Sequence, residues 1–318
     1  MTLVSILSVS GAPGVSTLAC LLASTWAVPG PVTVVECDAS GGDLAARFGL
    51  SSSVGWPSLI AAVRRTGSST PLDPHLQYLP GGLPVLVGAH QGPPAAADGP
   101  EAEVVRSWSV ADGRGGIAGH AGDPGDGDDA GDSGDGDDAG AGDGGGGSGL
   151  VVIDLGRLPH AMEATDGWLE AADWTVVVVR DDPAGAVRVR NRAAELLART
   201  EGRLGLVVVG ANGFRCRELT ELAGLVPLGD VPFDPESAAV ASGASGAVRR
   251  LDRSQLLATV RRVALVVAAR TVGSDLVPAE ADRQVMSDGD SVGDRSTTVA
   301  RLSSIWPRSR RPPVEGRV

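Results

Sequence analysis

The sequence contains no lysine, because all 27 basic residues are arginine. No ammonium group is therefore available to neutralise a phosphate, form a Schiff base or act as a general base. The three cysteines, Cys20, Cys37 and Cys216, include no C-x-x-C pair, so their spacing predicts neither a disulfide framework nor a zinc site. No basic leader opens the chain, and no apolar run reaches the roughly 18 residues of a membrane span. These absences favour a cytoplasmic protein.

Aromatic residues are also scarce, at 3% of the chain against 42% hydrophobic residues in total. The core must therefore be built from Val, Leu, Ile and Ala, which is typical of a parallel sheet covered by helices on both faces. The four histidines show no spacing that suits a metal site.

Basic charge is missing from one long segment. From Asp123 to Asp143 the chain holds nine Asp and no basic residue, and removing these nine charges from the net charge of -12 leaves -3 for the remainder. The surrounding residues, 112–149, are almost entirely Gly, Asp, Ala and Ser, which bury too little apolar area to offset the entropy lost on ordering. We expect a disordered insertion. A calcium-binding β-roll is a weaker interpretation, because the near-repeat lacks apolar residues.

Around this insertion, short apolar runs alternate with helical patterns, which indicates an α/β fold with a doubly wound, mostly parallel sheet and helices on both faces. Seven strands are predicted, at residues 3–9, 32–36, 84–87, 150–155, 175–180, 204–209 and 226–231. Helices are predicted at residues 16–26, 42–48, 56–65, 184–199, 216–223, 236–242 and 254–269. These elements form one domain, residues 1–270, that the insertion interrupts.

The last residues, 271–318, turn polar and are expected to form a flexible tail. Within it, apolar residues of 299–306 fall near helical spacing and precede Arg308, Arg310 and Arg311. A short basic amphipathic segment of this kind can lie on an anionic membrane surface. An incidental arginine-rich tail is the alternative, and the sequence favours it slightly.

A glycine-rich turn joins the first predicted strand to the first helix. It reads Gly11-Ala12-Pro13-Gly14-Val15-Ser16-Thr17, the outline of a phosphate loop in which backbone N–H groups cradle phosphates, a lysine reaches the β- and γ-phosphates and a hydroxyl binds Mg²⁺. Val15 stands at the lysine position, and Pro13 has no N–H to donate. The glycines also suit a plain tight turn, and Ser16 also suits a helix N-terminus without any ligand.

Several motifs after this loop resemble the MinD/ParA class of P-loop ATPases. In that class the loop reads K-G-G-x-G-K-T-T, and Ser10 stands at its first lysine. Residues 34–38 are similar to the strand that ends in D-x-D, which implies that Asp38 orients the attacking water and that Glu36 replaces the first aspartate. Residues 151–156 are similar to the strand whose final aspartate, here Asp154, holds Mg²⁺ together with Ser16.

The same resemblance extends to the base of the nucleotide. Gly210-Ala211-Asn212 is similar to the segment in which an Asn reads adenine, and Val231-Pro232-Phe233-Asp234 to a late turn beside the base. The implied nucleotide site therefore comprises Gly11, Ala12, Gly14, Val15, Ser16, Thr17, Asn212 and Pro232. Asp38 and Asn212 each precede glycines, so both also suit ordinary turns.

Two further stretches, residues 38–50 and 79–86, resemble a CpaE-like and septum-site-determining-like branch of this class from high-GC bacteria, in which degenerate loops are common. The resemblance implies ATP or ADP with Mg²⁺ as ligand, a nucleotide-dependent homodimer, and protein partners in a septum, pilus or secretion machine. It also implies a cytoplasmic protein at the inner face of the membrane, which the tail would contact.

The missing lysines bear on the function and leave three hypotheses open. Phosphoryl transfer depends on charge stabilisation, so we expect weak nucleotide binding and slow or absent hydrolysis, unless Arg47 or Arg180 supplies the charge. One alternative is a pseudo-ATPase that serves only as a protein-binding platform. A second is a DNA-associated partition protein that uses arginine clusters such as Arg261-Arg262, and the acidic balance makes nucleic acid the least favoured partner.

Overall fold

A computed structural model describes residues 1–11, 13–88, 99, 102–106, 149–158, 163–210, 213–244 and 251–272. The predicted insertion lies outside the described residues except for its last position, Gly149, and so does the predicted tail beyond residue 272. Ala12 and Asn212, two residues of the predicted nucleotide site, also lie outside them.

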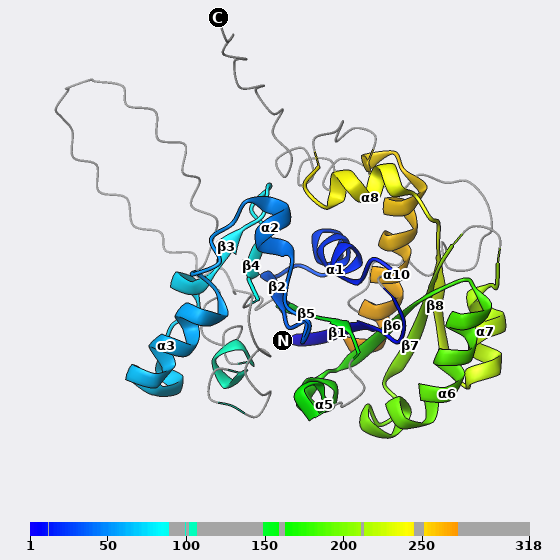
Figure 1. The fold of residues 1–318 in the computed structure, drawn as a ribbon, viewed down its shortest axis with the longest axis horizontal. Helices are drawn as coiled ribbons and strands as arrows, with labels where there is room; N and C mark the ends of the chain where they lie inside the picture. The colour runs from blue at the N-terminus through cyan, green and yellow to red at the C-terminus, as the bar shows by residue number, and fades with distance from the viewer. Residues whose placement is uncertain are drawn as a thin grey trace, which may run out of the picture.

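The centre of the molecule is an eight-stranded sheet (Figure 1). Its strands are β1 (Thr2–Ser8), β2 (Val32–Glu36), β3 (Gln77–Tyr78), β4 (Pro84–Leu86), β5 (Leu150–Arg157), β6 (Trp174–Arg180), β7 (Leu204–Val209) and β8 (Val226–Val231). The spatial order is β3-β4-β2-β5-β1-β6-β7-β8, and every pair is parallel except β3 with β4. The α/β, doubly wound fold class is confirmed, with one antiparallel edge strand added to the seven predicted strands.

Helices cover both faces of the sheet. One face carries α1 (Val15–Ser24), α2 (Leu44–Phe48), α8 (Pro235–Ala241) and α10 (Gln255–Thr271), and the other carries α3 (Trp56–Thr66), α5 (Glu163–Ala171), α6 (Pro183–Arg199) and α7 (Cys216–Ala223). Two 3₁₀ turns, Gly67–Ser69 and Asp73–His75, follow α3. All seven predicted helices are present, and α5 is a further helix that the pattern did not predict.

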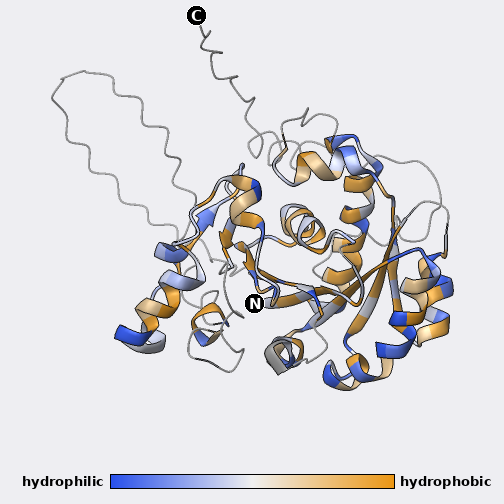
Figure 2. Cartoon of the chain, viewed as in Figure 1, coloured by the Kyte–Doolittle hydropathy of each residue, from blue (hydrophilic) through white to orange (hydrophobic). Residues whose placement is uncertain are grey.

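Alternation along the strands supplies both cores. Val4 and Ile6 of β1 point into the core beneath α1 and α10, whereas Leu3 and Leu7 point into the core beneath α3, α5 and α6. Because both faces are buried, the strands read as continuous apolar runs, and Figure 2 shows hydrophobic colour along the central strands and on α1. Within the described part of the chain, no helix combines the length and apolar character that crossing a membrane requires.

The register of the sheet brings three strand ends together. β5 lies between β1 and β2, where Asp154 is paired with Ile6 on one side and with Glu36 on the other. Parallel strands end at the same edge, so residues that follow β1, β2 and β5 meet there, beside the start of α1.

Candidate functional site

The turn between β1 and α1 contains two glycines with positive φ. Gly11 has φ of 58° and Gly14 has φ of 96°, a left-handed conformation that L side chains rarely adopt. A Cβ built on either glycine would meet no atom within 4 Å, so the backbone conformation, not crowding, requires glycine here. Gly14 is the N-cap of α1 and provides no side chain to cap the first N–H groups of the helix. Uncapped N–H groups at a helix N-terminus are a suitable site for an anion.

Val15, at the lysine position of the loop, packs into the core. Its side chain is only 6% exposed and belongs to the apolar cluster of α1 that includes Leu18 and Ala19. Ser10, at the other lysine position, is 9% exposed. Neither position therefore presents a cation to the open side of the turn.

Ser16 and Asp154, the residues expected to hold Mg²⁺, lie together. The Ser16 hydroxyl lies close enough to the Asp154 carboxyl group to affect its pKa, and Gly156 N–H donates to Asp154 Oδ1 at 3.0 Å. Asp154 is 0% exposed, and its Oδ2 has no hydrogen-bond partner among the described residues. Burial raises the pKa of Asp154 to about 7, and the Ser16 hydroxyl opposes that rise. A buried carboxylate oxygen without a donor is a suitable ligand for a divalent cation.

Glu36 performs a structural role. Its Oε1 accepts from the backbone N–H groups of Asp43 (2.7 Å) and Leu44 (2.9 Å), and its Oε2 accepts from Gly88 N–H (2.7 Å). A Cβ added at Gly42 would lie 2.1 Å from Glu36 Cδ, so glycine is required for this approach. Burial raises the pKa of Glu36 against the effect of these three donors. Glu36 thus joins the end of β2 to the start of α2 and to the chain after β4.

The Asp38 carboxyl group packs against the backbone of Gly156, two residues after Asp154. A Cβ built on Gly156, whose φ is 58°, would be 1.9 Å from Asp38 Oδ2, so the carboxylate occupies the space above this glycine. Asp38 Oδ1 accepts a hydrogen bond from Ser40 N–H at 2.7 Å, which is the turn-forming contact expected of an Asp at this position. Burial raises the pKa of Asp38, and the nearby charge of Asp43 adds to that rise.

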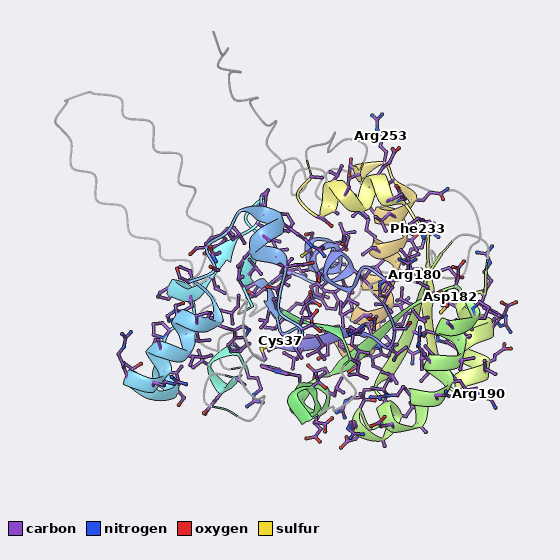
Figure 3. All side chains as sticks on the ribbon, viewed as in Figure 1. Cys37, Arg180, Asp182, Arg190, Phe233 and Arg253 are labelled. Carbon is purple, nitrogen blue, oxygen red and sulfur yellow. The ribbon has the colours of Figure 1, made fainter. Side chains whose placement is uncertain are left out.

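A second group of residues named in the sequence analysis, Arg180 and Phe233, lies at the ends of β6 and β8 (Figure 3). The Arg180 guanidinium carbon is 5.9 Å from the centroid of the Phe233 ring, and Phe233 is 59% exposed. Pro232, the residue expected beside the base, precedes Phe233 and is half-buried. Asp234 Oδ1 accepts from Ser237 N–H at 2.9 Å and caps α8, which gives this residue a structural role.

Sequence patterns did not reveal two contacts of this site. Asp181 Oδ2 accepts from Gly213 N–H at 2.7 Å, and the Asp181 carboxyl group occupies the space above Gly210, so it contacts the described residues on either side of 211–212. Thr17 Oγ1 lies 3.0 Å from Ser242 Oγ at the end of α8. The Asp-Asp pair after β6 and the glycines after β7 are sequence features that could have indicated the Asp181 contact. Thr17 and Ser242 are 225 residues apart, and no sequence pattern connects them.

The described carboxylates do not make a metal site by themselves. In the part of the chain that the structure describes, no group of three or more His, Cys, Asp or Glu side chains is arranged to hold a metal ion. Mg²⁺ in phosphate-binding sites usually takes one or two protein ligands and completes its shell with water and phosphate oxygens. The pair of Ser16 and Asp154 fits that use, and it does not fit a stand-alone metal centre.

Comparisons with known proteins identify the fold. No family model matches the sequence, and no curated protein matches it. Solved structures match well: the MinD cell division protein of Aquifex aeolicus has 12% identity and a TM-score of 0.58, with 85% of this chain and 97% of that chain covered. A ParA family ATPase from Chlorobium tepidum TLS has 17% identity and a TM-score of 0.55, with 83% and 98% covered.

A third structure is the septum site-determining protein MinD of Pyrococcus horikoshii OT3, complexed with Mg-ADP. It has 12% identity and a TM-score of 0.51, with 87% of this chain and 99% of that chain covered. At these identities the similarity establishes the fold, which is that of the MinD/ParA ATPases.

Proposed function

We propose that this chain is a MinD/ParA-type protein that binds ATP or ADP with Mg²⁺ weakly and hydrolyses ATP slowly or not at all. The observation that carries the proposal is the arrangement at the start of α1. An uncapped helix N-terminus lies beside Ser16 and beside the buried, unpartnered Oδ2 of Asp154, in the fold of proteins that include a Mg-ADP complex.

Each part of such a ligand has suitable groups in the chain. The open N–H groups of α1 would bind phosphate oxygens, and Ser16 with Asp154 would hold Mg²⁺, which when bound would neutralise phosphate charge. Asp38, above Gly156, would orient an attacking water, and the base would lie beside Pro232, with Asn212 reading adenine. Gly11, Gly14, Val15 and Thr17, with Ala12, would form the turn around the phosphates.

Slow or absent hydrolysis follows from the burial of Val15. A side chain that is 6% exposed in an apolar cluster brings no charge to the terminal phosphate. Removing a cation that stabilises the transferring phosphoryl group costs roughly 10³ to 10⁵ in rate. The same observation favours the second candidate, a platform that keeps the fold and binds protein partners without any nucleotide.

The proposed cellular role follows the structural neighbours. The names of these proteins refer to cell division, septum placement and the ParA family of ATPases. We place this chain in a similar role, as a nucleotide-dependent homodimer that positions or regulates a septum, pilus, secretion or partition machine. The proposal includes a cytoplasmic location, with membrane contact through the tail at residues 299–311.

Thermal unfolding with and without nucleotide tests the binding proposal. A ligand at about 100 times its Kd stabilises a protein by roughly 2.7 kcal/mol, which corresponds to several degrees in Tm. We expect such a rise with Mg-ADP or Mg-ATP at millimolar concentration, and we expect it to be lost in Asp154→Ala. Glu221→Gln, an exposed change on α7, is the matched control. An unchanged Tm with every nucleotide would instead support the platform.

Phosphate release tests the hydrolysis proposal separately. We expect turnover far below that of a family member with both lysines, assayed in parallel. Turnover at a comparable rate that Asp38→Ala abolishes would refute slow hydrolysis and would leave nucleotide binding intact as a conclusion.

A further inference from the structure

The start of α1 has different charge on two of its sides. Ser16 and Thr17 are consecutive helical residues, so their side chains leave the helix about 100° apart. Ser16 meets the Asp154 carboxyl group, near which Asp38 lies over Gly156. Thr17 meets Ser242, and Ser242 Oγ in turn accepts from Arg47 Nη1 at 3.5 Å. One side of the site therefore carries two carboxyl groups, with Arg157 near Asp38, and the other side leads to the Arg47 guanidinium group.

Arg47 is held at this position by packing between two helices. A Cβ built on Gly243, just after α8, would lie 2.8 Å from Arg47 O and 2.9 Å from Phe48 Cδ1. The end of α2 thus rests directly on the end of α8, next to Ser242. This packing places the backbone of Arg47 next to the residue that follows Ser242, independently of the hydrogen bond between the Arg47 and Ser242 side chains.

The guanidinium group has only a weak competitor for a phosphate. Its ion-pair partner is Asp43, four residues earlier at the N-cap of α2, and the side chains are 32% exposed for Arg47 and 50% exposed for Asp43. Solvent-exposed ion pairs of this type contribute little free energy. A phosphate oxygen that arrives at the Thr17 side would form a stronger, charge-assisted hydrogen bond with Arg47.

We propose that this site selects a nucleoside diphosphate over the triphosphate, with Arg47 as the residue that binds phosphate from the Thr17 side. The proposal rests on the proposed function and specifies its ligand. In phosphate loops the backbone cradles the α- and β-phosphates, while the lysine reaches the β- and γ-phosphates. Here the lysine position is the buried Val15, so the described loop offers no cation to a γ-phosphate, and the carboxyl groups of Asp154 and Asp38 lie on the metal side.

The unpartnered oxygen of Asp154, which also supports the proposed function, indicates what the ligand must bring to the site. That residue is fully buried, and its Oδ2 lacks a hydrogen-bond donor among the described residues, which points to a cation brought with a ligand. A diphosphate with Mg²⁺ supplies that cation without adding a third phosphate beside the carboxylates. ATP brings one more negative charge to the side on which Asp38 and Asp154 lie, where Arg157 is near Asp38 but neither lysine position of the loop provides a cation.

Isothermal titration with Mg-ADP and Mg-ATP, at equal free Mg²⁺, tests the proposal. We expect the wild-type chain to bind ADP about tenfold more tightly than ATP, which is the effect of one charge-assisted contact without a counterpart. In Arg47→Gln both affinities should fall by roughly 10- to 150-fold, with their ratio unchanged. Asp43→Asn, which frees Arg47, should strengthen both by a few-fold. Arg64→Gln, an exposed change on α3, is the charge-matched control.

The outcomes separate this inference from the proposed function. Wild-type binding of ATP as tight as or tighter than that of ADP would overturn the selectivity, and equal affinities in Arg47→Gln and Arg64→Gln would overturn the role of Arg47. A loss in Arg47→Gln confined to ATP would place the guanidinium at the γ-phosphate and refute the assignment. In each of these cases nucleotide binding itself stands. Failure of the wild-type chain to bind either nucleotide would refute both proposals.

A folding control accompanies the titrations. Unfolding of each ligand-free variant in urea should give the wild-type midpoint within error, because Arg47 and Asp43 form an exposed pair. Arg47→Lys should restore part of the lost affinity, since it keeps the charge. Lack of any rescue by lysine, together with a lowered midpoint in Arg47→Gln, would identify Arg47 as a structural residue and refute the assignment.

Discussion

The protonation of Asp154 should make the stability of the ligand-free protein depend on pH. The carboxyl group is fully buried, and burial raises its pKa from 3.8 to about 7. The folded protein therefore holds this proton more tightly than the unfolded chain does. Its stability is highest below the unfolded pKa and falls as the pH rises from about 4 to about 7. The displacement of the pKa corresponds to roughly 4 kcal/mol across that window.

Asp154→Asn should remove this pH dependence. The amide is close to the carboxyl group in shape, carries no charge at any pH, and its Oδ1 can still accept from Gly156 N–H. At pH 5 we expect the variant and the wild type to have similar free energies of unfolding. At pH 8 the variant should be more stable by about 2 to 4 kcal/mol, because it avoids a buried charge whose Oδ2 has no donor in the described structure.

Urea unfolding at pH 5, 6, 7 and 8, without Mg²⁺ or nucleotide, measures the effect. Glu36 and Asp38 also have raised pKa values, so the wild-type curve contains their contributions, and the difference between wild type and Asp154→Asn isolates Asp154. A difference that stays constant from pH 5 to pH 8 would refute the reasoning. Added Mg²⁺ with nucleotide should stabilise the wild type at pH 8 and leave Asp154→Asn unchanged.

Three further changes test individual contacts. Glu36→Gln replaces one of two oxygens that accept three backbone N–H groups, so we expect a loss of about 2 to 4 kcal/mol in urea unfolding, against less than about 0.5 kcal/mol for the exposed Glu221→Gln. Gly156→Ala should destabilise by at least about 2 kcal/mol, since its Cβ would overlap Asp38 Oδ2 at a φ of 58°; a neutral result would contradict the placement of Asp38. Val15→Lys should lower stability by roughly 1.5 to 3 kcal/mol through lost burial, and it should raise affinity for ATP more than for ADP; an equal rise for both would contradict the assignment of Val15 to the γ-phosphate side.

Most of the fold follows from apolar periodicity. The strands are buried on both faces, so runs such as Val151 to Leu155 stand out without any knowledge of their partners. β3 was missed because it has only two residues and is recognisable only through its pairing with β4. α5 was missed because its sequence, EATDGWLEA, contains a glycine and has few apolar residues, although Trp168 and Leu169 are fully buried.

The candidate site also contains contacts that could be predicted from the sequence and contacts that could not. The family resemblance implied that Ser16 and Asp154 lie together, and the structure places the two side chains near each other. Glu36 was interpreted as a replaced aspartate of the site, and its three backbone donors come from residues 7, 8 and 52 positions away, which no local pattern specifies. The link from Thr17 through Ser242 to Arg47 likewise depends on how α2 and α8 meet, and that is decided by packing.

At the edge of the sheet beside α1, the absence of lysine and the presence of a buried carboxylate are unfavourable together unless a ligand is present. A loop that lacks lysine provides no cation for nearby carboxylates to balance. The buried Asp154, whose Oδ2 has no partner among the described residues, destabilises the folded chain, and an Asn at the same position would avoid this cost. The carboxylates make physical sense if a divalent cation supplies the charge that the lysines do not. Mg²⁺ would then be the main positive charge of the site, with Arg47 second.

If Mg²⁺ supplies most of the positive charge, nucleotide affinity should fall much more steeply on removal of Mg²⁺ here than in a family member that keeps its lysines. Titration of ADP with and without chelator in both proteins measures this, and equal losses would show that the carboxylates do not act through a metal.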